Sequence, residues 1–94
     1  MSVGIPEYYN WLSHHRNLMT PDVIVVKQEG RFFVELSEGA GIEGSPLYGV
    51  SVIEWDGNKF SAISKLSDAW SKSFKDKRAA LHHFEMARAA VRRA

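Results

Sequence analysis

The chain contains no cysteine among its 94 residues. Disulfide bridges, thiolate metal sites and cysteine nucleophiles are therefore excluded. It also lacks an apolar run long enough to span a bilayer, and residues 1–6 lack the basic and apolar regions of a signal peptide. We therefore expect a cytoplasmic protein that does not act at a membrane.

The length predicts one domain, residues 1–94, in which nearly every large apolar side chain is needed for the core. Such a small domain has little room for a deep catalytic cleft. With 45% hydrophobic and 24% charged residues, the composition is that of an ordinary globular protein rather than a disordered chain.

The strongest local signal is the pair Asp56-Gly57. This pair favours a two-residue hairpin turn, because glycine accepts a positive φ and aspartate tolerates one. Apolar and β-branched residues flank it, which predicts a hairpin of residues 48–55 with residues 58–65. A second turn at Ser67-Asp68 and the alternation up to Phe74 predict a third strand, so that residues 47–74 form a meander.

A basic amphipathic helix is predicted after this meander. Asp76 is a suitable N-cap, since its carboxylate can accept hydrogen bonds from the free amides of the first turn. Apolar residues then recur at spacings of three and four and form a stripe that must cover a sheet face. The stripe comprises Ala80, Leu81, Phe84, Ala87 and Val91.

The first half of the chain predicts a short amphipathic helix over residues 6–19 and a hairpin. The hairpin joins the β-branched run Val23–Val26 to the alternating residues 31–38 through a turn at Glu29-Gly30. The fold class is therefore α+β: an antiparallel sheet of two hairpins and four to five strands, with an N-terminal and a C-terminal helix.

Residues 39–44 match the pattern G-x-G-x-x-G, which in some proteins cradles a pyrophosphate. That mechanism needs a helix beginning at the loop, with free amides directed at the phosphate. Here Ser45-Pro46 and a strand follow. We therefore interpret the segment as a glycine-rich linker between the two hairpins.

Two histidine pairs, His14-His15 and His82-His83, raise the question of a metal site. Neighbouring helical residues point about 100 degrees apart, so neither pair chelates an ion alone. A site would need His15 and His82 to meet, with Glu85 as a further ligand, and a packing role for His15 is favoured. No serine lies in a nucleophile elbow, and the acidic residues are scattered. We expect no cofactor, no metal and no enzymatic activity.

Charge is distributed unequally: residues 1–46 carry three basic and six acidic residues, whereas residues 47–94 carry nine and five. Basic and aromatic residues of the second half are the candidate binding residues for a protein or for nucleic acid. They are Trp55, Lys59, Lys65, Trp70, Lys72, Arg88, Arg92 and Arg93. Core packing is favoured for the tryptophans. The lysines also suit protection of strand edges, and the arginines suit the last turn of the helix.

Residues 47–94 resemble the three-stranded sheet and helix of AP2-type and integrase amino-terminal DNA-binding domains. The resemblance rests on Gly49-Val50 in the first strand, an aromatic residue in the second, a phenylalanine before the helix and an alanine-rich stripe. Phe74, Ala80, Phe84 and Ala87 occupy the corresponding places. The strands lack the dense arginines with which that family contacts DNA, so the resemblance implies the fold more than the function.

In size and type the chain is also similar to small phage and prophage proteins that bind a host protein, such as anti-CRISPR proteins. We therefore expect a non-enzymatic interaction protein that binds stoichiometrically, as a phage-type inhibitor of a host nucleic-acid-handling complex. The alternative is a small DNA- or RNA-binding module that uses residues 47–74 and the basic C-terminal helix. An exposed edge strand would in addition permit a homodimer.

Overall fold

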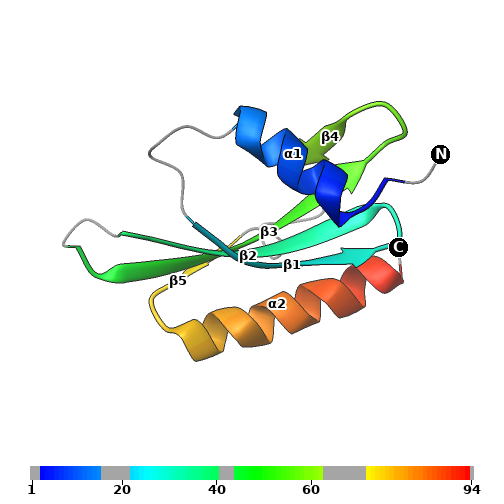
Figure 1. The fold of residues 1–94 in the computed structure, drawn as a ribbon. Coiled ribbons are helices and arrows are strands. Elements are labelled where there is room, and N and C mark those ends of the chain that lie inside the picture. The colour runs from blue at the N-terminus through cyan, green and yellow to red at the C-terminus, as the bar shows by residue number, and fades with distance from the viewer. Residues whose placement is uncertain (1–2, 16–21, 41–43, 63–71, 94) are drawn as a thin grey trace.

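The computed structural model describes residues 3–15, 22–40, 44–62 and 72–93. The element order is α1 (Ile5–His15), β1 (Asp22–Glu29), β2 (Phe32–Ala40), β3 (Pro46–Trp55), β4 (Phe60–Ala62), β5 (Lys72–Phe74) and α2 (Lys77–Arg92). The predicted α+β class is confirmed. One antiparallel sheet lies between the two helices, with α1 on one face and α2 on the other (Figure 1).

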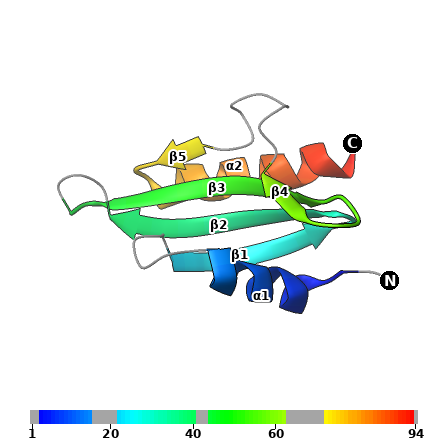
Figure 2. The same cartoon turned by 90° about the horizontal axis from the view of Figure 1, so that it is seen from above.

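The sheet order is β1-β2-β3-β4, and β5 also pairs with β3. Since β2 occupies one edge of β3, both short strands lie on its other edge: β4 pairs with residues 53–55 and β5 with residues 48–50 (Figure 2). β4 and β5 therefore form one interrupted edge strand. The expected meander, with the third strand beside the second, is wrong, because β3 is long enough to pair with two short strands in succession.

Both predicted hairpin turns are present, but the second is longer than expected: Trp55 pairs with Phe60 rather than with Asn58, so residues 56–59 connect β3 to β4. Gly30 has φ 63° between β1 and β2, and Gly57 has φ 97° between β3 and β4. Both are conformations that an L side chain rarely adopts. In the second turn the Asp56 carboxylate accepts from the amides of Asn58 and Lys59 at 2.8 and 2.9 Å, and these hydrogen bonds lower its pKa.

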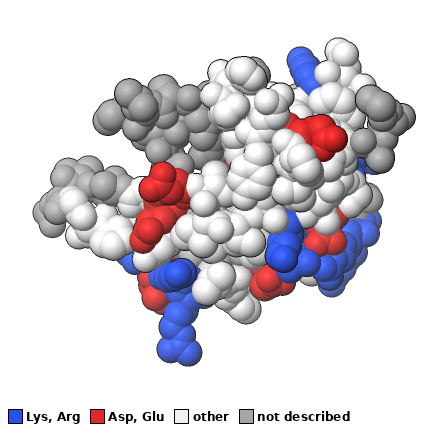
Figure 3. Space-filling model, in the orientation of Figure 1, with Lys and Arg blue, Asp and Glu red and all other residues white. Residues whose placement is uncertain are grey.

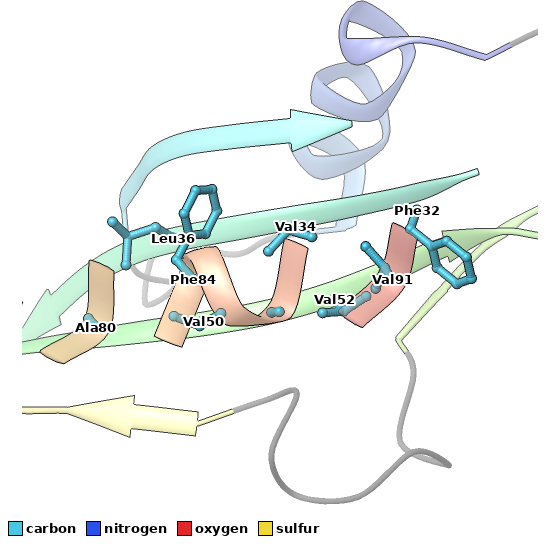
Figure 4. Close-up of a cluster of buried hydrophobic side chains, with 9 residues drawn as sticks. Phe32, Val34, Leu36, Val50, Val52, Ala80, Phe84 and Val91 are labelled. Carbon is cyan, nitrogen blue, oxygen red and sulfur yellow. The ribbon is translucent and has the colours of Figure 1, made fainter. Parts of the chain in front are cut away.

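β2 lies in the interior of the sheet and buries both of its faces, as its unbroken run of buried residues shows. Its even-numbered positions face α2 and form a core with apolar residues of β3 and α2 (Figure 4). This core comprises Phe32, Val34, Leu36, Val50, Val52, Ala80, Phe84, Ala87 and Val91. Four of the five residues of the predicted helix stripe are buried in it, and Leu81 is the exception.

The second core lies between α1 and the opposite face of the sheet. It contains Tyr8 and Leu12 of α1, Val26, Phe33 and Ile53. Half-buried aromatic rings of Trp11, Trp55 and Phe60 pack against it. Phe60 lies at the centre of these rings, 4.8 Å from Trp55 and 5.2 Å from Trp11 between ring centroids. The β3–β4 hairpin is thereby packed against α1.

The helix boundaries agree with the sequence where they can be compared. α2 begins after Asp76, whose side chain accepts from the amide of Arg78 at 3.3 Å, so the predicted N-cap is confirmed. The predicted helix at residues 6–19 is observed as Ile5–His15, and residues 16–19 lie outside the described residues. Within the described chain, neither helix has the length and apolar character needed to cross a membrane.

Candidate binding surfaces

The basic residues near the end of α2 meet an acidic residue of β1. Glu29 is the last residue of β1, and only 12% of its side chain is exposed. Arg88 donates from Nε to Oε2 at 2.9 Å. Arg92 donates from Nε to Oε1 at 2.7 Å and from Nη2 to Oε2 at 3.1 Å. Arg88 and Arg92, two of the predicted binding residues, therefore also connect α2 to β1 through ion pairs.

These contacts change the acidity of both partners. The hydrogen bond from Arg92, opposed by burial and aided by Arg88, lowers the pKa of Glu29. The same contact with Glu29 raises the pKa of Arg92. Arg88 also lies 3.1 Å from Glu85, one turn earlier on the helix. The positive charge of this flank of α2 is thus largely matched by carboxylates.

A hollow of about 280 Å³ opens beside this network. It lies between the β1–β2 turn and the end of α2, and is lined by Glu29, Gly30, Arg31, Phe32, Val91 and Arg92. The Arg31 guanidinium lies over the Phe32 ring, 4.8 Å from its centroid, and its Nε donates to Glu54 at 2.6 Å. Two guanidinium groups, each held by a carboxylate, therefore meet apolar residues at one opening.

Glu29 and Arg31 were not among the residues that the sequence singled out. A usable signal was present, because an acidic and a basic residue flank Gly30 in a predicted turn. What the sequence did not show was that the end of α2 lies beside this turn. Arg93, the third predicted arginine, is the C-cap of α2 and is exposed.

The remaining predicted residues do not form one surface within the described chain. Trp55 is half-buried against Phe60, and Lys59 is exposed in the β3–β4 turn. Lys72 of β5 pairs with Val50, whereas β4 pairs three to five residues further along β3, about 10–17 Å away at the rise of a strand. The side chain of Lys72 is not described, and Lys65 and Trp70 lie outside the described residues.

Among the described residues, the two histidine pairs and the glycine-rich segment do not form a binding site. The two histidine pairs lie on α1 and α2, which the sheet separates. Among the described residues, no group of three or more histidine, aspartate or glutamate side chains is placed to hold a metal ion. Gly39 and Ala40 belong to β2, and residues 41–43 of the glycine-rich segment lie outside the described part.

β1 provides a second exposed feature. Within the described chain it pairs only with β2, so no described strand pairs with its other edge, and α1 lies over this side of the sheet (Figure 2). Ile24 on this edge strand is 41% exposed, as is Leu81 of α2. Figure 3 shows uncharged side chains across the middle of the face toward the viewer, with basic side chains gathered at its lower right.

Comparison with known proteins adds no further constraint on these surfaces. No family model, no curated protein and no solved structure matches the chain.

Proposed function

We propose that this chain is a non-enzymatic protein that binds a partner protein stoichiometrically, and that an acidic segment of the partner enters the hollow beside Glu29. The observation that carries the proposal is the pair Arg31 and Arg92, which line an open hollow together with Phe32 and Val91. Arginine and aromatic residues are enriched among the residues that dominate binding energy at protein interfaces.

The guanidinium groups are suited to carboxylate recognition. A guanidinium presents five N–H donors in a planar fork that matches a carboxylate. Glu29 engages Nε and Nη2 of Arg92, and Glu54 engages Nε of Arg31. Among the described residues nothing occupies the other donors of the two groups, which leaves them available to a ligand. The carboxylates already restrict the orientation of both groups, which lowers the entropy lost on binding.

The balance of charge favours a protein partner over a nucleic acid. Around the hollow, Arg31, Arg88 and Arg92 alternate with Glu29, Glu54 and Glu85. These three positive and three negative charges cancel, and a surface without an excess of positive charge releases few counterions from a phosphate backbone. In its more specific form, our proposal is that the partner belongs to a nucleic-acid-handling complex that this chain inhibits, in the manner of the small phage proteins that it resembles in type.

The test is an affinity capture from a lysate with and without nuclease treatment, at two salt concentrations, with Arg31→Ala beside the wild type. Arg78→Ala, an exposed arginine at the start of α2, is the matched control. We expect one partner, in a one-to-one ratio, to be retained by the wild type and the control and lost from Arg31→Ala. Equal retention by Arg31→Ala would overturn the proposal. Binding that disappears with nuclease, or that falls steeply with salt, would instead support the nucleic-acid alternative.

A further inference from the structure

The open edge of β1 carries an inference that is independent of the hollow. An edge strand presents unpaired N–H and C=O groups, and the segment Val23-Ile24-Val25-Val26 has a strong preference for extended structure. Such an edge can be closed by a strand from another molecule. The distribution of side chains along β1 indicates which strand fits.

A β-bulge determines how these side chains are distributed. The register of β1 against β2 shifts between Val23 and Val25. Val23 and Val26 both pack into the core on the α1 side, and Val25 packs on the α2 side. In a regular strand, residues three positions apart would face opposite sides of the sheet. The bulge therefore gives Val23 and Val26 a common face.

The charged residues of β1 follow the same shift. Lys27 lies opposite Val34, which faces α2. Asp22 lies opposite Glu38, which shares the α2 side because it is two positions from Leu36 in β2. Asp22 and Lys27 therefore lie on one face although five positions separate them.

We propose that β1 pairs in antiparallel fashion with β1 of a second copy of this chain, about a twofold axis between Ile24 and Val25. In this register Asp22 lies opposite Lys27 of the second copy, and Val23 opposite its Val26. Residues directly opposite in an antiparallel pair must share a face, and both pairs meet this condition. An axis through Val25 would instead set Val23 against Lys27, which face opposite sides.

Charge complementarity supports a second copy as the occupant. Within one molecule Asp22 and Glu38 are exposed carboxylates directly opposite each other, an unfavourable arrangement. Lys27 of the second copy would supply a cation to this pair, and the symmetry repeats the contact. Because such a contact uses the same patch on both molecules, it closes after two copies and leaves no open β1 edge.

The dimer would also cover an exposed apolar side chain beside the proposed axis, since Ile24 is 41% exposed. The hollow at Glu29 lies beyond the paired segment and stays open.

Sedimentation equilibrium of charge-exchange variants tests the register. We expect a concentration-dependent dimer of the wild type, and a dissociation constant about tenfold higher for Asp22→Lys or Lys27→Asp alone, since each variant creates two like-charge pairs. An equimolar mixture of the two variants should dimerise as the wild type does, because every pair then joins opposite charges again. Lys75→Asp, the same change at an exposed site outside β1, should leave the dimer unchanged.

The stability of Asp22→Lys, measured on the dilute monomer, shows whether a loss of dimerisation comes from the changed interface or from unfolding of the variant. Because the variant replaces the repulsion between Asp22 and Glu38 by attraction, the monomer should be at least as stable as the wild type. A monomeric wild type at millimolar concentration would overturn the proposal. So would unchanged dimers of the single variants, or a mixture that stays monomeric.

Discussion

The Tyr8 hydroxyl donates a hydrogen bond of 2.7 Å to the carboxylate of Glu35, and both side chains are buried between α1 and the sheet. The Tyr8 ring is also stacked on Phe33, with centroids 4.9 Å apart. A carboxylate in an apolar layer is costly unless it is hydrogen-bonded. Tyr8 therefore both packs α1 against the sheet and satisfies a polar group at the centre of it.

Replacing Tyr8 by phenylalanine should lower the free energy of unfolding by about 1–3 kcal/mol, because Glu35 loses a donor while staying buried. Urea unfolding followed by tryptophan fluorescence measures the change. Tyr9→Phe is the control, since Tyr9 is 45% exposed, and it should stay within about 0.5 kcal/mol of the wild type. Equal effects of the two variants would show that the Tyr8 hydroxyl contributes nothing specific.

Glu29→Gln should make stability less dependent on pH. The pKa of Glu29 lies below its ordinary value of 4.5 in the folded protein, so its contribution is fully present above that value and is lost as the pH falls through the folded pKa. We expect a loss of about 1–2 kcal/mol at pH 7 that shrinks below a pH of about 4.5.

Urea unfolding of the wild type and Glu29→Gln at several pH values between 3 and 7 checks this prediction. Glu85→Gln is the control, because Glu85 contacts only one of the two arginines, at an exposed position, and should cost less than about 0.5 kcal/mol. A difference between wild type and Glu29→Gln that persists unchanged to pH 3 would contradict the assignment.

Truncation of Phe84 should be the more damaging of two matched changes on α2. Phe84 is buried in the core between α2 and the sheet, so Phe84→Ala should cost about 3–5 kcal/mol through lost burial and a cavity. Met86→Ala lies on the same helix with 55% of the residue exposed and should cost less than about 0.5 kcal/mol. Thermal unfolding followed by circular dichroism measures both changes. Similar midpoints for the two variants would show that α2 does not pack against the sheet through Phe84.

Substitutions of Gly30 test the backbone conformation of the β1–β2 turn, because they alter no side-chain contact. Its φ is 63°, and a Cβ at this position would meet nothing within 4 Å. Gly30→Val should therefore cost about 1–2 kcal/mol from backbone strain, whereas Gly30→Asn should cost less, because asparagine tolerates a left-handed conformation. If both variants unfolded at the same urea concentration, the turn would not need this conformation.

The sequence could identify two arginines of the candidate surface, but it could not identify the residues that lie beside them. Arg88 and Arg92 stood out as cations in the last turns of a predicted helix. Their partner Glu29 is 59 residues from Arg88 along the chain, and no local pattern encodes that distance. The hollow and its second arginine, Arg31, exist only because the end of α2 lies beside the β1–β2 turn.

The sequence by itself determined the local elements of this protein. Asp56-Gly57 and Glu29-Gly30 mark the turns, Asp76 caps α2, and the period-two and period-three-to-four patterns distinguish the strands from the helices. Each of these features depends on backbone preferences within a few residues, which neighbouring side chains reveal directly.

Only the tertiary structure decided how the elements combine. It placed β5 beside β3 rather than β4, set α1 and α2 on opposite faces, and brought Tyr8 to Glu35 and Glu29 to Arg92. The physical reason is that an apolar stripe or an open strand edge must be covered, but nothing in that segment specifies which other part of the chain covers it. That choice depends on how all the elements pack at once, which no single segment contains.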